Sequence, residues 1–305
     1  MKMDLARGSR GRPGTYSIVA RDPASGQFGV AVQSHWFSVG PLVPWARAGV
    51  GAVATQANVE VSYGPRALEL LAAGTGARQA LAGLVAADPG AAHRQVAVVD
   101  AAGGVGTHTG SSCVQFAGHV TGAAVSCQGN LLSSEDVWPA MLAAFEASAG
   151  PLAGKLLTAL DAGEVAGGDA RGRQSAALVV VGATGEPWEA LVSLRVEDHP
   201  APLVELRRLL ELHEAYGLAD AADRLAGEGR HAEAAEVYQR ASALAPQNHE
   251  LAFWSGLGLA QSGDMDAALE RVRAAIEAHP GWRAILERLP PEMAPAAAAV
   301  RGRLE

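Results

Sequence analysis

Short apolar runs separated by turn residues dominate the first part of the chain. Segments 15–21 (TYSIVAR) and 27–34 (QFGVAVQS) combine β-branched and aromatic residues, and the intervening sequence DPASG is typical of a turn. This pattern predicts a β-hairpin that opens the folded part of the chain. The glycine- and valine-rich segment 49–56 predicts a third, buried strand.

Helical and extended segments then alternate in blocks. Apolar residues recur at helical spacing over 65–87, and Gly74 and Gly76 divide this segment into two helices. Further strands are expected at 95–100, 104–108, 112–116 and 119–127, helices at 134–148 and 151–162, and a last strand pair at 175–182 and 186–196. Two antiparallel sheets that each cover an apolar face with paired helices predict an α+β fold, specifically a four-layer α/β/β/α sandwich over residues 15–200. Other α+β arrangements are compatible with the same order of elements.

The remainder of the chain is helical in pattern and contains an internal repeat. Small residues and prolines recur 34 positions apart, as Gly229 and Gly263, Ala234 and Ala268, Ala241 and Ala275, and Pro246 and Pro280. This spacing resembles the tetratricopeptide repeat. We expect a linker helix over 201–214, a small all-α helical-repeat domain over 215–296 and a tail over 297–305. A generic pair of alanine-rich helical hairpins is the alternative.

Composition narrows the classes of partner. Hydrophobic residues make up 49% of the chain and charged residues 18%, which is enough apolar content for a large core. The formal charge of −8 disfavours nucleic acid as a partner. No apolar run is long enough for a membrane-spanning helix, so a cytoplasmic protein is expected. Residues 1–14 are basic and glycine-rich without an apolar stretch, which predicts a disordered leader.

Metal and cofactor motifs are absent from the sequence. Two cysteines, Cys113 and Cys127, cannot form a four-ligand metal site, and the nine histidines show no metal-binding spacing. The glycine-rich segments do not match a phosphate-binding loop. We therefore expect neither metal nor organic cofactor. Lysine occurs only at Lys2 and Lys155, so a mechanism that needs a lysine in the folded body depends on Lys155.

Thr15 is the first candidate for chemistry, because it opens the first core strand directly after the leader. Cleavage between Gly14 and Thr15 would give this residue both a hydroxyl and a free α-amino group. Such an amine titrates near pH 8 and can act as general base for its own hydroxyl. A structural role is the alternative, since threonine is a good strand former.

Polar residues near strand ends supply the other candidates. In the segment 167–177 (GGDARGRQSAA), Asp169 can hold an arginine or accept hydrogen bonds from backbone amides, and Arg173, Gln174 and Ser175 precede an apolar strand. An Asp–Arg pair that merely fixes the loop is the structural alternative. The other polar residues at strand or helix boundaries are Gln33, Ser34, Arg47, Gln56 and Tyr63.

Two of these candidates have a specific expected role. Arg47 precedes a strand and would suit recognition of a substrate carboxylate. Gly129 predicts a tight turn after a strand that aims Asn130 and nearby amides inward, as in an oxyanion hole.

Several segments together resemble one protein family. TYSIVARDP, FGVAVQS, VPWARAGVGAVATQA, SYGPRALELL and GGDARGRQSAAL are similar to sequences of the bacterial DUF1028 family, over about residues 15–213. That family is similar in fold to the N-terminal nucleophile (Ntn) hydrolases, which have an α/β/β/α sandwich. The resemblance implies a nucleophile position at Thr15, an oxyanion region near Asn130, and an associated loop that contains Asp169, Arg173, Gln174 and Ser175.

The leading hypothesis is an Ntn-type amidohydrolase that acts on a small amide or peptide-like metabolite. Thr15 would be the nucleophile, Asn130 would stabilise the oxyanion, Asp169 and Ser175 would orient the amine, and Arg47 or Arg173 would bind a substrate carboxylate. The rival is a non-catalytic protein that binds a small molecule or peptide, with the helical repeat as a module for a protein partner. Self-association into a homo-oligomer through the repeat is a third hypothesis.

Overall fold

The computed structural model describes residues 14–304, which divide into two compact units at Arg207. The first unit contains two antiparallel sheets with helices, and the second is helical. This confirms the predicted mixed α and β architecture with antiparallel sheets and a C-terminal helical region. Of the predicted leader, all but Gly14 lies outside the described residues.

The larger sheet has six strands in the order β10-β9-β2-β1-β8-β7. Its central hairpin is the predicted one, and every neighbouring pair is antiparallel. The strands are β1 (Thr15–Arg21), β2 (Phe28–Ser34), β7 (Gly118–Gly122), β8 (Val125–Asn130), β9 (Ser175–Val181) and β10 (Val192–Val196).

The smaller sheet has four strands in the order β3-β4-β5-β6. They are β3 (Pro44–Arg47), β4 (Gly51–Ala57), β5 (Arg94–Asp100) and β6 (Val105–Thr109), with the short 3-10 helix η1 (Ala91–His93) leading into β5. Side chains alternate across β4 as a strand requires. Ala52 and Ala54 face the larger sheet, whereas Val53 faces the helices.

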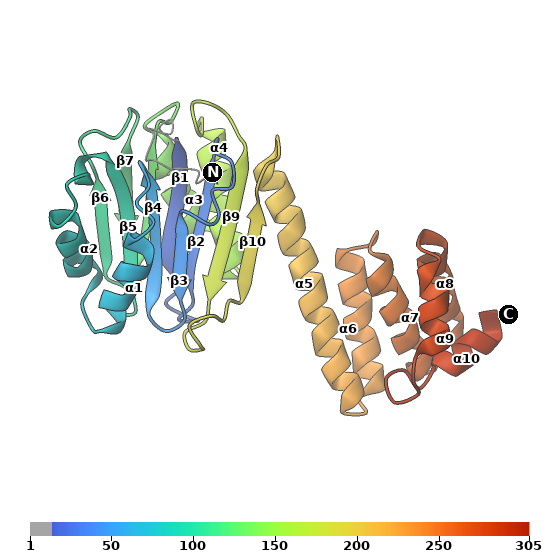
Figure 1. The fold of residues 1–305 in the computed structure, drawn as a ribbon. Helices are drawn as coiled ribbons and strands as arrows, with labels where there is room; N and C mark the ends of the chain where they lie inside the picture. Colours follow the sequence, from blue (N-terminus) through green and yellow to red (C-terminus); the bar gives the residue numbers. More distant parts are fainter. Residues whose placement is uncertain (1–13, 305) are drawn as a thin grey trace, which may run out of the picture. The chain divides into compact units, whose positions relative to one another are not determined.

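Helices cover the outer face of each sheet (Figure 1). The pair α1 (Tyr63–Ala72) and α2 (Ala77–Ala86) packs on the smaller sheet, and α3 (Val137–Ala147) and α4 (Leu152–Val165) pack on the larger one. The inner faces of the two sheets contact each other through a cluster that includes Val19, Val30 and Val99. The space between the sheets is therefore apolar over most of its extent.

Some strand predictions were wrong because turns or irregular backbone interrupt the expected segments. The expected strand 119–127 is the hairpin β7–β8, in which Ala124 has a positive φ of 55°. The expected strand 112–116 is irregular, and the Cys113 amide donates to the Gly110 carbonyl. Of the segment expected at 186–196, only β10 is extended, since 186–189 forms a turn. Strand β3 was not predicted.

The second unit continues the chain as helices. They are α5 (Pro202–Gly227), α6 (His231–Leu244), α7 (His249–Ser262), α8 (Met265–Ala278), α9 (Gly281–Arg288) and α10 (Ala297–Leu304). The expected linker helix 201–214 is part of the longer α5, and most of the expected tail 297–305 forms α10. Gly263 ends α7 in the left-handed conformation at φ 103°, which glycine adopts without strain. No helix within residues 14–304 is long and apolar enough to cross a membrane.

Leu156 on α4 gives a direct test of the packing on the larger sheet. The residue is fully buried, and a Cβ added to Gly29 of β2 would lie 2.4 Å from its Cδ1 atom. Leu156→Ala should lower the free energy of unfolding by about 2–5 kcal/mol, because it leaves a cavity above the strand. Urea denaturation measures the loss in unfolding free energy. Amide hydrogen exchange of the folded protein shows whether β1 and β2 lose protection. Val165→Ala, at an 89% exposed position of the same helix, should have almost no effect, and equal losses would contradict this packing.

Candidate functional site

Strand register places four of the predicted polar residues in one row. Thr15 of β1 lies opposite Ser34 of β2 and Asn130 of β8, and Ser34 lies opposite Ser175 of β9. Directly opposed residues in antiparallel strands point to the same face of a sheet. All four side chains are buried, and that of Thr15 is only 1% exposed. The row lies at one end of the larger sheet.

Hydroxyl groups surround the carbonyl oxygen that precedes Thr15. Thr15 Oγ1 donates to the Gly14 carbonyl oxygen at 2.6 Å, and Ser34 Oγ donates to the same oxygen at 2.5 Å. Arg171 Nη2 is a further donor at 2.8 Å. A carbonyl oxygen has two lone pairs, so three donors compete for it, and the two hydroxyls are also within 3.0 Å of each other. The Gly14 carbonyl is therefore strongly polarised.

Asp169 fixes the arginine that contacts this carbonyl. Its buried carboxylate accepts from Arg171 Nη2 at 2.8 Å and from Arg171 Nε at 3.1 Å. The backbone amides of His35 and Arg171 also donate to it, at 2.8 and 2.9 Å. A Cβ added to Gly14 would lie 2.7 Å from Asp169 Oδ1, so only glycine fits at this position without displacing the carboxylate.

The Asp169 loop is held against the end of β8. The Ser133 amide donates to the Gly168 carbonyl, the Ala170 amide donates to the Leu131 carbonyl, and Leu132 forms a β-bridge with Asp169. The predicted Asp–Arg pair is present, but the residue that reaches the row is Arg171, which the sequence reasoning did not single out. The Asp-x-Arg spacing in a glycine-rich loop is the signal that could have identified it.

A network of uncharged side chains fills the space between the sheets beside Thr15. Gln56 Nε2 donates to the Thr15 carbonyl at 3.3 Å and to Gln95 Oε1 at 2.8 Å. Ser17 Oγ donates to Gln56 Oε1 at 2.7 Å and accepts from Gln128 Nε2 at 2.7 Å. These side chains are essentially inaccessible to solvent. Every one of these buried polar groups thus has a partner, as burial in an apolar core requires.

Gln95 joins the two sheets within this network. Its Oε1 atom accepts from Asn130 Nδ2 at 3.0 Å as well as from Gln56. Its Nε2 atom donates to the carbonyl oxygens of Gly118 and Gly129 at 3.0 and 2.7 Å and to Thr109 Oγ1 at 3.0 Å. Neither Gln95 nor Gln128 was singled out from the sequence. The signal for Gln128 was polar alternation through Ser126, Gln128 and Asn130 in one strand.

Asn130 does not occupy the turn that the sequence predicted. Gln128, Gly129 and Asn130 are strand residues of β8, and the side-chain amide of Asn130 donates to Gln95. The side chain lines a cavity of about 10 Å³, together with Cys113 and other residues. A cavity of this size holds about one water molecule. The inward-aimed oxyanion turn at Gly129 is therefore wrong in its geometry.

Ser175 and Gln33 have other surroundings than Thr15. Ser175 Oγ donates to the Trp36 carbonyl at 2.5 Å and accepts from the Val39 amide at 3.1 Å, so it stabilises the turn after β2. Gln33 is adjacent to Ser34 in β2 and therefore points to the helix-covered face of the sheet. Its side-chain oxygen and nitrogen are buried without a hydrogen-bond partner among the described residues.

Three further candidates lie away from the row or near the surface. Arg173 is half-exposed and pairs with Glu164 at 2.5 Å, and Gln174 donates to Asp198 at 3.1 Å. Arg47 is opposite Gly51, at the far end of β4 from Gln56, so it cannot bind a substrate beside Thr15.

Tyr63 belongs to the helices that cover the smaller sheet. Its hydroxyl contacts Asp88 at 3.2 Å and the Leu84 carbonyl at 3.4 Å. Burial, with a smaller contribution from Asp88, raises the pKa of Tyr63 to about 12. The phenol therefore stays neutral at physiological pH and has a structural environment.

No side-chain base contacts the Thr15 hydroxyl. Its hydrogen-bond partners among the described residues are the Gly14 carbonyl and the Ser34 hydroxyl. The ammonium group of Lys155 lies 4.5 Å from the ring of Phe145, in the helix layer outside the larger sheet. Within residues 14–304, no three His, Cys, Asp or Glu side chains are grouped to hold a metal ion.

The network allows a test through Gln95→Glu. The glutamate lacks the side-chain amide that donates hydrogen bonds in the wild type. Burial raises the pKa of its carboxyl group in the folded state above the unfolded value of about 4.3. The loss in unfolding free energy therefore grows as pH rises above about 4.3. We expect a loss in unfolding free energy of about 3 kcal/mol at pH 7 and a smaller loss at pH 4. Denaturation curves at both pH values measure it. The exposed Gln79→Glu on α2 should behave like the wild type, and a pH-independent loss would refute the network.

Comparison with known proteins gives consistent results for the first unit. A crystal structure of the protein SPO2555 from Silicibacter pomeroyi, described as DUF1028, aligns with a TM-score of 0.60 and 34% identity, over 65% of this chain and 85% of that one. No curated protein matches the chain. Residues 15–206 match DUF1028, a family of unknown function, which confirms the resemblance seen in the sequence. Since the match spans more than half of its residues, the chain belongs to the DUF1028 family.

Proposed function

We propose that the α/β unit is an amidohydrolase of the N-terminal nucleophile type that cleaves an amide or peptide-like bond in a small metabolite. Thr15 is the nucleophile, and it acts after removal of the residues that precede it. The observation that carries this proposal is the Thr15 hydroxyl against a polarised Gly14 carbonyl, at the first residue of a central strand. The order of layers, with helices outside two facing sheets, supports an Ntn-hydrolase-like fold.

The general base in this proposal is the α-amino group of Thr15, since no described side chain is positioned to act as a base on its hydroxyl. Cleavage of the Gly14–Thr15 bond would give Thr15 an α-amino group, whose ordinary pKa of about 7.7–8.0 suits it to take a proton at neutral pH. The hydroxyl oxygen attacks the substrate carbonyl carbon as its proton moves to this amine. The amine then protonates the leaving nitrogen as the C–N bond breaks, and water hydrolyses the resulting ester of Thr15.

The donors around Gly14 suggest the oxyanion site. Ser34 Oγ and Arg171 Nη2 meet the Gly14 carbonyl oxygen at 2.5 and 2.8 Å. A substrate carbonyl in the same place would meet the same two donors, and such donors stabilise developing negative charge. We therefore assign the oxyanion role to Ser34 and Arg171 rather than to Asn130. Asp169 is a positioning residue, because it holds the guanidinium of Arg171.

The site that would bind the acyl group of the substrate has little space around the α-carbon of that group. Gly14 occupies the equivalent position, and a side chain there would collide with the Asp169 carboxylate. The proposal therefore favours substrates whose acyl α-carbon is unbranched, such as glycyl or acetyl groups.

A binding protein without turnover is the second candidate. The lack of a side-chain base among the described hydrogen-bond partners of the Thr15 hydroxyl favours it. In this case the helical unit would be a tetratricopeptide-like module for a protein partner. The 34-residue spacing supports that module, because Gly229 and Gly263 both have positive φ at turns between helices.

Thr15→Ala tests the nucleophile. We expect wild-type protein to mature to a chain that begins at Thr15, and the variant to keep its leader and lose turnover by a factor on the order of 10⁴ or more. Intact mass and assays on N-acyl and ureido compounds measure both effects. Thr158→Ala, which removes a hydroxyl on α4, is the matched control and should mature and react normally. A leader retained by the wild type would exclude the amine mechanism, and unchanged turnover in Thr15→Ala would move the nucleophile elsewhere.

Gly14→Ala tests the geometry around the scissile carbonyl. The added Cβ displaces the Asp169 carboxylate and with it Arg171, so we expect loss of the leader to slow by at least about tenfold. Mass spectra collected over time after synthesis give the rate. Gly83→Ala on α2, where a Cβ meets nothing within 4 Å, should mature at the wild-type rate. Equal rates for both variants would show that Asp169 and Arg171 do not act on this bond.

A further inference from the structure

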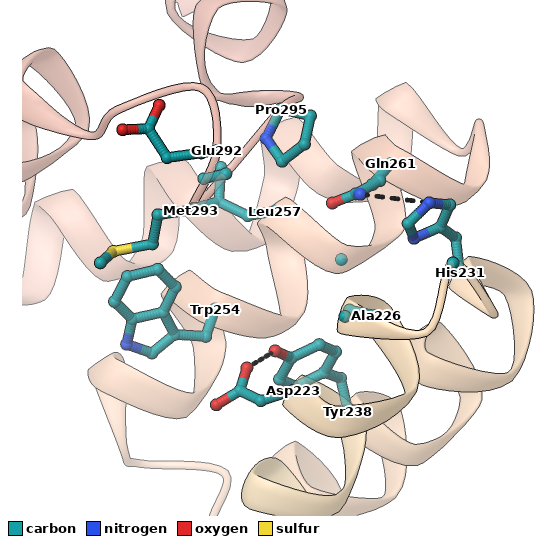
Figure 2. Close-up of a pocket in the computed structure, with 14 residues that line it drawn as sticks. Asp223, Ala226, His231, Tyr238, Trp254, Leu257, Gln261, Glu292, Met293 and Pro295 are labelled. Carbon is teal, nitrogen blue, oxygen red and sulfur yellow. Dashed lines mark hydrogen bonds between the residues drawn. The ribbon is translucent and has the colours of Figure 1, made fainter.

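The helical unit contains a groove that the proposed hydrolase chemistry does not use (Figure 2). It lies among the end of α5, the helices α6 and α7, and the segment 292–295, and its volume is about 720 Å³. Grooves of this size commonly bind small ligands or several side chains of a peptide. Its walls include Trp254, Leu257 and Met293.

One side of the groove carries the carboxylate of Asp223, which is held in place by Tyr238. The Tyr238 ring packs on Gly258, where a Cβ would lie 2.7 Å from the ring, and the Tyr238 hydroxyl donates to Asp223 (Figure 2). Burial, reinforced by Asp223, raises the pKa of Tyr238, so the phenol stays protonated and continues to donate. Asp223 accepts this hydrogen bond through one carboxylate oxygen, and its other oxygen accepts none from the described residues.

The charge of the groove is negative and unbalanced. Among the described residues, its lining contains the carboxylates of Asp223 and Glu292 and no lysine or arginine. The nearby guanidinium of Arg230 is paired with Glu228 and Glu233 instead. Met293 is 66% exposed, so the apolar wall is open to solvent.

We propose that this groove binds an extended segment of another protein that carries an arginine or lysine side chain. The cationic head pairs with Asp223, and the aliphatic stem lies along Trp254, Leu257 and Met293. A cation can pair with a carboxylate and also interact with the face of an aromatic ring. The aliphatic stems of arginine and lysine pack against apolar surface. The groove is larger than one side chain requires, which favours a peptide over a single amine. This binding is independent of the hydrolase proposal.

Titration calorimetry on the full chain tests the proposal. The probes are acetylated and amidated alanine–leucine octapeptides that differ only at the fourth position, where they carry arginine, lysine, glutamine or glutamate. We expect the arginine and lysine peptides to bind, and the glutamine and glutamate peptides to bind at least tenfold more weakly. Equal binding of the arginine and glutamine peptides, or no binding of any, overturns the proposal. Equal binding of free arginine amide also overturns it, because the groove is then a small-molecule site.

Two variants locate the binding. Asp223→Asn keeps an acceptor for Tyr238 but removes the charge, and it should weaken the arginine peptide at least tenfold. Asp220→Asn removes the same charge from the same helix outside the groove, and it should have less than a twofold effect. Trp254→Leu keeps an apolar wall and should reduce the preference for arginine over glutamine. Equal effects of the two aspartate variants, with helical content unchanged by circular dichroism, would place the binding elsewhere.

Discussion

The candidate site depends on a requirement that polar groups between two apolar sheets be fully hydrogen-bonded. Gln95 meets this requirement for both sheets at once, because its amide reaches Gln56 on its own sheet and the Asn130 side chain and Gly129 carbonyl on the other. Loss of one partner in such a buried set leaves several others unsatisfied. Gln56 in turn contacts the Thr15 carbonyl. The position of Thr15 is thus tied to both sheets.

Antiparallel register also brings the polar residues of the row together. Thr15, Ser34 and Ser175 are far apart in the sequence, yet they are cross-strand neighbours because the strands that carry them are adjacent. A shift of one residue in any pair would turn these hydroxyls to the helix-covered face. The apolar partners Val30 and Val19, which must face the other sheet, prevent such a shift. The same burial that stabilises the core therefore aligns the row.

The sequence pattern predicted those elements of the fold that depend on neighbouring residues in the chain. The β1–β2 hairpin and the paired helices were predicted because turn residues and apolar spacing are short-range signals. The β7–β8 hairpin was missed because its turn is formed by two alanines at 123 and 124, which are not typical turn residues, and Ala124 has a positive φ. Thr15 and Ser34 were identified as polar residues at strand ends, whereas Asn130 was expected in a turn and instead ends β8. Gln95 was not identified, since its importance comes from partners that are distant in the chain. Arg171 was missed although its spacing from Asp169 in a glycine-rich loop was a local signal.

The bonding of the Asp169 loop to the end of β8 has an energetic consequence. The Gly168 and Leu131 carbonyls bond to amides of the opposite segment, so the loop is part of the folded framework rather than a mobile connection. Water molecules around a charged oxygen must reorient each time a reaction occurs, and this costs free energy in every cycle. The dipoles here take up their orientation once, during folding. An oxygen atom that replaces the Gly14 carbonyl would enter an environment that is already ordered.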